Sequence, residues 1–241
     1  MINKKLKILS LFAGAGGMDL GFKNAGFDIV WANDFDPDSV KTYKRNFGDH
    51  IVLGDIEKIK TNQMPDNPDV VIGGFPCQGF SIANLGRSVD DSRNKLYKQM
   101  LRVIRVKKPK YFVAENVEGI LTLGKGAVIQ KILKDFKSIG YKVDYKLLNA
   151  ADYGVPQARK RVFIIGNRLG LDNPYPSQTH QAPTKRSDIL FDARLQNYVT
   201  TKEAINFLSK VPITNKTIYV KNRIIHNHMA DTNVHDEFWG R

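Results

Sequence analysis

The chain has 241 residues, 42% of them hydrophobic, which is enough for one sizeable α/β domain or one domain with an appendage. Its single cysteine excludes an intramolecular disulfide and a cysteine-rich zinc site, and the absence of a long apolar run or a signal peptide predicts a cytoplasmic protein with no membrane partner. The net charge of +13 suits a polyanionic partner such as nucleic acid, although charge alone cannot separate DNA from RNA.

The first part of the chain alternates predicted strands with predicted helices. Lys5 to Ala13 and Phe27 to Ala32 are expected to be buried strands, separated by the glycine-rich turn FAGAGG and a helix from Met18 to Ala25. Strand, glycine-rich turn and helix form the opening of a nucleotide-binding βαβ unit, although tight turns also use glycine for packing alone. A helix from Pro37 to Phe47 and a third strand from Ile51 to Leu53 are expected next.

Acidic residues follow two of these predicted strands. Asp34 lies about 20 residues after the glycine turn, where a ribose-binding acid is expected. An alternative role for Asp34 is the N-cap of the helix that begins at Pro37. Asp55 follows the third strand, so several strand ends are predicted to direct acidic or glycine-rich loops into one crevice.

The stretch from Gly73 to Ser81 reads GGFPCQGFS and follows a predicted buried strand at Asp69 to Ile72. Its glycines and proline favour a sharply shaped loop, and ligands in open α/β sheets gather outside the carboxyl ends of the strands. Cys77 is therefore a candidate nucleophile. The alternative is a small buried hydrophobic residue, which the flanking glycines and proline disfavour.

The remaining elements complete a mixed sheet. Residues 82–94 are polar and are interpreted as a mobile segment that could close over an active site. Helices are predicted over Leu96 to Lys107 and over Val128 to Ile139. A strand is predicted over Tyr111 to Ala114, which leads into Glu115, and an antiparallel pair over Tyr141 to Leu148 and Arg161 to Gly166. The loop between the last two strands contains Gln157, Arg159 and Arg161.

Beyond Asn167 the pattern weakens. Thr200 and Glu203 resemble a capping box for a helix over Lys202 to Lys210. The histidines of this region lack nearby carboxylate or cysteine partners, so no metal is expected. Asp172 to Tyr175 resembles the Asn/Asp-Pro-Pro-aromatic loop of amino-group methyltransferases, but it lacks the second proline and is interpreted as a turn.

Several of these segments together resemble the bacterial C5-cytosine DNA methyltransferases. The resemblance extends from Leu6 to about Arg168, with weaker similarity to His228, and rests on FAGAGG (12–17), DFD (34–36), GD (54–55), GFPCQGFS (74–81), ENV (115–117) and QARKR (157–161). These motifs stand in the family's order. The resemblance implies a Rossmann-like, S-adenosylmethionine-dependent methyltransferase fold of class α/β, a mixed sheet with helices on both faces.

The resemblance implies covalent catalysis on cytosine. Cys77 is expected to attack C6 as a thiolate, which makes C5 nucleophilic enough to take the methyl group. Glu115 is expected to hold N3 protonated and to accept a hydrogen bond from the exocyclic amine. Arg159 is implied to contact the cytosine carbonyl, and Arg161 a phosphate and sugar. The plainer alternatives are a strand-end carboxylate for Glu115 and a solvated basic turn for the arginines.

The resemblance also implies where the cofactor and DNA bind. S-adenosylmethionine would contact Phe12, Gly14, Gly16, Gly17, Asp34, Phe35, Asp55, Ile56 and Pro76. The target base must leave the duplex stack to reach the pocket, and residues 81–94 resemble the loop that closes over it. Gln78, Ser81, Arg87 and Arg161 are the expected DNA contacts.

The family normally continues with a target-recognition domain and a returning helix, and neither is apparent in residues 169–241. We therefore expect a catalytic and cofactor-binding domain over residues 1–168 and a lead-in toward the recognition domain over residues 169–241. Because an α/β sheet needs helices on both faces, a second polypeptide is expected to supply the absent parts. A truncated chain is the alternative.

The expected function is methylation of cytosine C5 in a specific double-stranded DNA sequence, within a restriction–modification system. Two other functions stay open: a non-catalytic or incomplete subunit that needs a second polypeptide, and an RNA cytosine-C5 methyltransferase.

Overall fold

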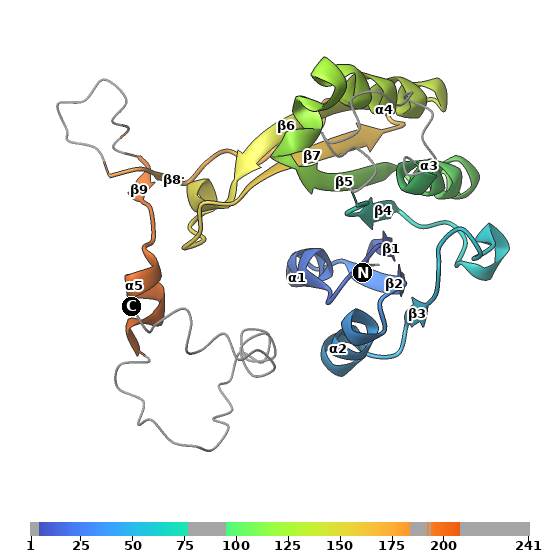
Figure 1. Ribbon diagram of the computed structural model, residues 1–241, viewed down its shortest axis with the longest axis horizontal. Coiled ribbons are helices and arrows are strands. Elements are labelled where there is room, and N and C mark those ends of the chain that lie inside the picture. The colour runs from blue at the N-terminus through green and yellow to red at the C-terminus, as the bar shows by residue number, and fades with distance from the viewer. Residues whose placement is uncertain (1–4, 77–94, 184–191, 193, 208–241) are drawn as a thin grey trace.

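The computed structural model describes residues 5–76, 95–183, 192 and 194–207. Its centre is a seven-stranded sheet with the strand order β3-β2-β1-β4-β5-β7-β6 (Figure 1). The strands are β1 (Lys7–Leu11), β2 (Asp28–Asp34), β3 (Ile51–Leu53), β4 (Val70–Gly73), β5 (Tyr111–Val117), β6 (Lys142–Asn149) and β7 (Lys160–Asn167). The first five strands pair in parallel, while β7 runs antiparallel to both β5 and β6.

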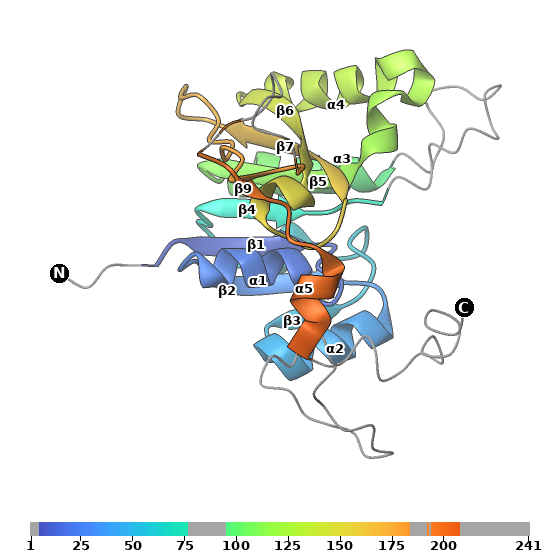
Figure 2. The same cartoon turned by 90° about the vertical axis from the view of Figure 1, so that its left-hand side faces the viewer.

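Helices cover both faces of this sheet. The helices α1 (Gly17–Asn24) and α2 (Pro37–Phe47) lie on one face, and α3 (Lys95–Lys107) and α4 (Ala127–Ser138) lie on the other (Figures 1 and 2). Short 3-10 helices occupy several connections: η1 (Thr61–Gln63), η5 (Glu118–Leu121), η6 (Leu123–Gly126) and η7 (Ala150–Tyr153). A small parallel pair, β8 (His180–Gln181) with β9 (Gln196–Asn197), and the helix α5 (Thr201–Ile205) follow the main sheet.

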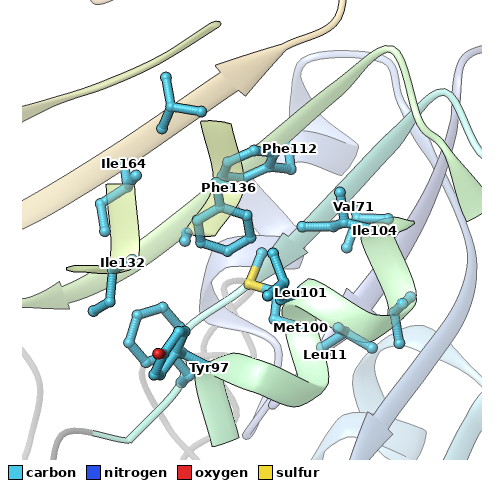
Figure 3. Packing of buried hydrophobic residues seen from close by; sticks show 14 of the residues in the cluster. Leu11, Val71, Tyr97, Met100, Leu101, Ile104, Phe112, Ile132, Phe136 and Ile164 are labelled. Carbon is cyan, nitrogen blue, oxygen red and sulfur yellow. The ribbon is translucent and has the colours of Figure 1, made fainter. Parts of the chain in front are cut away.

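The larger part of the core lies between the sheet and the pair α3 and α4 (Figure 3). Phe112 on β5 and Phe136 on α4 are fully buried, with ring centroids 4.4 Å apart. Gly166 lies beside Phe112 on β7, where an added Cβ would come within 2.1 Å of the Phe112 ring. Glycine is therefore required at this position by the close approach of the aromatic ring.

The predicted order of strands and helices is confirmed, including the antiparallel pair β6 and β7, and the predicted bounds of α2 and β3 are those observed. Most other boundaries shift by one or two residues, and two of the differences bear on the site. β2 continues to Asp34 and the N-cap of α2 is Asp36, whose carboxylate accepts from the Ser39 N–H at 2.8 Å, so the alternative N-cap role of Asp34 is wrong. β5 continues to Val117 because β7 pairs with its whole length.

The region after the main sheet agrees with the sequence in two respects. The Thr200–Glu203 capping box is present at the start of α5, which ends at Ile205 within the described part of the chain. Asp172 to Tyr175 forms an irregular loop against the sheet edge, where Asn173 donates to the Ile165 carbonyl at 3.0 Å. None of the helices in the described ranges combines the length and apolar character that a bilayer crossing requires.

Candidate active site at the carboxyl edge of the sheet

The sheet topology brings the predicted site residues to one edge. The loops after β1, β2, β3 and β4 and the last residues of β5 all lie at the carboxyl edge, because these five strands are parallel. β7 runs the opposite way and therefore begins at this same edge, with Arg161 paired to Val117. Six different strands thus contribute to one edge of the sheet. They carry the predicted cofactor loops, the candidate catalytic carboxylate and the arginine segment.

The glycine-rich loop after β1 has an unusual backbone. Phe12, Gly14 and Gly16 have φ angles of 54°, 55° and 92°, which is the left-handed region. Gly16 is required by packing, because an added Cβ would lie 2.3 Å from the Phe47 ring of α2. At Gly14 and Gly17 an added Cβ would meet nothing within 4 Å, so the protein's own packing does not demand glycine there. This open space suits the close approach of a ligand to the backbone.

Asp34 faces the glycine loop from the end of β2. Its carboxylate accepts from the Gly14 N–H at 2.7 Å and from the Asp36 N–H at 2.9 Å, so it fixes the loop relative to β2. The neighbouring Phe35 is 71% exposed. Large aromatic side chains are mostly buried in folded proteins, and one left open beside a ligand loop can stack on a planar group.

Asp55 lies in the turn after β3, where its carboxylate accepts from the Glu57 N–H at 2.9 Å. The turn is held by Asn33 of β2, which donates to the carbonyls of Val52 and Gly54 at 3.0 and 2.8 Å. Asn33 is buried, and no local sequence signal indicates its role, because that role depends on the pairing of β2 with β3. Ile56, an expected cofactor contact, is 3% exposed and its side chain packs in the main core.

Glu115 is oriented by an ion pair near the end of β5. The Arg161 Nε atom donates to Glu115 Oε1 at 2.9 Å, and each side chain is about a quarter exposed. The other carboxylate oxygen, Oε2, lies close to Gly74: a Cβ added to this glycine would lie 3.2 Å from it. Gly74 belongs to the loop that leads to Cys77, so the carboxylate lies directly against the predicted nucleophile loop.

Asn116 holds the same loop from the opposite face of β5. Its side chain is buried and Nδ2 donates to the Phe75 carbonyl at 2.9 Å, two residues before Cys77. Its Oδ1 atom accepts from the Val117 N–H, also at 2.9 Å. The sequence marked Asn116 only as part of a motif, and its anchoring role needed the pairing of β4 with β5 to become visible.

The arginine segment divides into two environments. Arg161 contacts Glu115, as described above, and its Nη1 atom also donates to the Lys160 carbonyl at 2.7 Å. Arg159 is exposed, and its carbonyl accepts from the Ala150 N–H at 2.9 Å, which closes the loop between β6 and β7. Pro76 is the last described residue before the gap, and Cys77, Gln78, Ser81 and Arg87 lie outside the described residues.

A separate cavity of about 780 Å³ lies at the opposite, amino edge of the sheet, lined by residues such as Lys7, Asp69, Lys110 and Arg168. None of the predicted site residues lines it. In the described ranges, no group of three or more His, Cys, Asp or Glu side chains could hold a metal ion.

Comparison with known proteins gives the family. A family model described as C-5 cytosine-specific DNA methylase matches residues 6–240. The chain belongs to this family. The match continues well beyond Arg168, where the recognisable motifs end, so the segment that follows the main sheet belongs to the family sequence as well.

The curated relatives are type II methyltransferases. M.NgoFVII of Neisseria gonorrhoeae is 43% identical over 225 residues, which cover 92% of this chain and 58% of the relative. M.BspRI of Lysinibacillus sphaericus is 40% identical, covering 86% of this chain and 54% of the relative. The chain thus spans little more than half the length of these relatives. M.AquIA of a Picosynechococcus strain is 43% identical and is covered to 88% of its length.

Solved structures agree with the fold. A prophage-encoded Escherichia coli protein described as a DNA modification methyltransferase superposes with a TM-score of 0.65 at 31% identity, covering 88% of this chain and 56% of that protein. The Dnmt2 methyltransferase of S. pombe superposes with a TM-score of 0.56 at 24% identity, covering 71% of this chain and 52% of that one. The methyltransferase fold expected from the sequence is confirmed.

Proposed function

We propose that this chain is the catalytic and cofactor-binding part of a DNA cytosine-C5 methyltransferase that acts on a specific double-stranded sequence in a restriction–modification system. The observation that carries the proposal is the Glu115–Arg161 pair, which lies against the loop leading to Cys77 and at the same edge as the glycine loop and Asp34. A binding module would not need this carboxylate and cation together with a lone thiol in the sequence that follows β4. The family membership and the type II methyltransferase relatives support the same reading.

The cofactor of this proposal is S-adenosylmethionine, which when bound supplies an electrophilic methyl group. The open backbone at Gly14 and Gly17 suits its methionine end, the Asp34 carboxylate suits ribose hydroxyls, and the exposed Phe35 ring suits the adenine face. Asp55 would accept from the adenine amine. The proposed cofactor site also includes the loops that contain Phe12, Gly16, Ile56 and Pro76.

The chemistry begins with the target cytosine turned out of the duplex stack. The Cys77 thiolate would add to C6, so that the electron pair of the C5–C6 double bond becomes available at C5 for the methyl group that bound S-adenosylmethionine would supply. Loss of the C5 proton and expulsion of the thiolate restore the ring. Covalent attack divides one difficult step into two easier ones.

Glu115 and the arginines would stabilise this sequence. As charge moves onto the pyrimidine, the Glu115 carboxyl would hold N3 protonated and accept from the exocyclic amine. Arg161 orients that carboxyl in the described geometry, whereas the exposed Arg159 is free to approach the cytosine carbonyl. Gln78, Ser81, Arg87 and Arg161 are proposed to contact DNA, and the chain's net charge of +13 favours that polyanion.

The proposal includes a second polypeptide that carries a target-recognition domain and a further helix for the sheet, with residues 1–168 as the catalytic domain and residues 169–241 as the lead-in. The stretch that matches is little more than half the length of M.NgoFVII and M.BspRI, whereas it covers 88% of M.AquIA. Sequence-specific methyl transfer from labelled S-adenosylmethionine by the purified chain alone would contradict this part of the proposal.

Covalent trapping tests the catalytic part. Duplex DNA containing 5-fluorocytosine should form a stable adduct with the wild-type chain and its partner in the presence of S-adenosylmethionine, because fluorine at C5 cannot be removed as a proton. The adduct should be lost in Cys77→Ser and slowed in Glu115→Gln. An adduct that survives Cys77→Ser would overturn the proposal. Cofactor binding without any adduct would support a non-catalytic subunit, and an adduct with RNA but not with DNA would support an RNA methyltransferase.

A further inference from the structure

A buried carboxylate lies directly behind the glycine-rich loop. Asp19, in the first turn of α1, is fully buried. It accepts hydrogen bonds from the Ser10 hydroxyl at 2.6 Å and from the Tyr43 hydroxyl at 2.7 Å. Burial raises the pKa of Asp19, although its two hydrogen bonds partly offset this effect. A carboxyl group is costly to bury, and the proposed chemistry does not use this one, so its place beside a ligand loop needs an explanation.

The Ser10–Asp19 hydrogen bond joins the two ends of the loop. Ser10 is near the end of β1 and Asp19 near the start of α1, nine positions later. Between them the backbone visits the left-handed region at Phe12, Gly14 and Gly16. Glycine adopts this conformation readily, but at Phe12 it persists only where the surroundings hold it in place. We call Ser10, Asp19 and Tyr43 the loop clasp.

Tyr43 connects the clasp to α2 and to the start of β3. Its hydroxyl lies 3.1 Å from the Nε2 atom of His50. Because Tyr43 donates its proton to Asp19, its oxygen can only accept from His50, which places the imidazole proton on Nε2. The Tyr43 ring also packs on Phe47 with centroids 4.6 Å apart, and Phe47 in turn fills the space beside Gly16. α2 therefore holds the loop at two points.

We infer that Asp19 is a positioning residue for the cofactor loop: through Ser10 and Tyr43 it fixes the backbone of residues 12–16 in the shape that receives S-adenosylmethionine. The inference rests on the proposed function. Asp19 is buried, so it acts through the loop and not by touching the ligand. The Gly14 N–H of this loop also donates to Asp34, so a displaced loop would disturb the proposed ribose site as well.

The experiment compares two tyrosines that each lose one buried hydroxyl. Tyr43→Phe removes the bond to Asp19, whereas the control Tyr141→Phe removes a bond of the same length, 2.7 Å, to the Pro109 carbonyl at the opposite edge of the sheet. For the full chain, calorimetry measures the affinity for S-adenosylmethionine, and amide hydrogen exchange measures the opening of residues 11–19. Tyr43→Phe should weaken binding about tenfold and speed exchange in this segment, whereas Tyr141→Phe should leave both within about twofold.

Two substitutions of Asp19, to asparagine and to alanine, separate its positioning of the loop from its contribution to the stability of the whole chain. Asp19→Asn can still accept from Ser10 and can donate to the Tyr43 oxygen, so it should retain more cofactor affinity than Asp19→Ala. Ser10→Ala is a smaller change that should act in the same direction as Tyr43→Phe, and it keeps the test open if a Tyr43 variant does not fold.

The outcomes distinguish this inference from the proposed function. Equal cofactor affinity and equal loop exchange in Tyr43→Phe and Tyr141→Phe would overturn the clasp. Wild-type chain that binds no S-adenosylmethionine would contradict the proposed cofactor instead, and the exchange measurement would then decide whether the clasp holds the loop.

Discussion

Asn116 is expected to set the position of the loop that carries Cys77, and Asn116→Asp tests this with almost no change of shape. In the wild type, the amide donates to the Phe75 carbonyl at 2.9 Å in a buried environment. Aspartate removes the donor and places a carboxylate oxygen against that carbonyl. The variant must therefore either leave that carboxylate oxygen and the Phe75 carbonyl without a donor between them or stay protonated at neutral pH.

The free-energy costs of the two routes bracket the expected loss of stability. A buried acceptor without a donor costs about 1–3 kcal/mol. Holding an aspartate protonated at pH 7 requires raising its pKa by roughly three units, which costs about 4 kcal/mol. We therefore expect a stability loss of about 2–4 kcal/mol, or roughly 5–15 °C in Tm for a chain of this length. The loss should shrink toward pH 4, because a protonated aspartate can donate to the Phe75 carbonyl again.

The assay uses the fact that Cys77 is the only cysteine in the chain. Alkylation by iodoacetamide then reports on Cys77 alone, and methyl transfer by the active enzyme reports on the whole reaction. Because a displacement of about 1 Å at a reacting group can cost about a hundredfold in rate, Asn116→Asp should lower kcat by about that factor and change the alkylation rate.

The matched control is Asn167→Asp, which makes the same change at the other end of the sheet. Asn167 is fully buried on β7 and donates to the Leu171 carbonyl at 2.8 Å. It should lose comparable stability and keep kcat within about threefold of wild type, since it lies far from the site. If Asn116→Asp loses stability as predicted but retains the wild-type kcat and alkylation rate, the anchoring role of Asn116 is wrong.

Three further predictions concern the glycine loop, the catalytic carboxylate and the pH dependence of stability. Gly16→Ala should cost roughly 2–4 kcal/mol and abolish cofactor binding in calorimetry, because its φ is +92° and its Cβ would lie 2.3 Å from an aromatic ring of α2. Arg161→Met should cost less than about 1 kcal/mol of stability, since the pair with Glu115 is partly exposed. It should nevertheless slow adduct formation on 5-fluorocytosine DNA at least about tenfold, because the carboxylate is released. An unchanged rate would contradict the orienting role of Arg161. Burial lowers the pKa of His50, so the unfolded chain binds more protons than the folded chain below pH 6.5, and the free energy of unfolding should fall on acidification through that range. Urea unfolding at pH 8 and at pH 5.5 measures this fall, which should be smaller in His50→Gln than in the wild type.

The sequence predicted the elements of the sheet well because each is encoded locally. β-branched runs such as Val70 to Ile72 indicate a buried strand wherever they occur. Pro37 and Gly48 bound α2 on both sides, and its bounds were predicted without error. The same local signal misplaced the end of β5, since Glu115 and Asn116 are polar and become strand only by pairing with β7.

The contacts of the candidate site depend on chain segments that are distant in sequence. Asn33 holds the turn of Asp55 about 20 residues away, and Asn116 holds the Phe75 carbonyl 41 positions earlier. A motif identifies such residues as a set but does not say which touches which. Asp19 shows the limit most clearly, because an acid inside a helix pattern is normally interpreted as exposed, and only the packing of α1 against β1 and α2 reveals that it is buried.

The direction of β7 gives the site its cation. In a sheet of parallel strands alone, a strand after β5 would begin at the amino edge, level with Tyr111. Its first residue would then lie about 13 Å from Glu115 along the strand direction. Because β7 is antiparallel, Arg161 instead pairs with Val117 and its guanidinium reaches the Glu115 carboxylate at 2.9 Å. The reversed strand also brings the loop with Arg159 to the carboxyl edge. The reversed direction of β7 is therefore what places Arg161 beside the candidate catalytic acid.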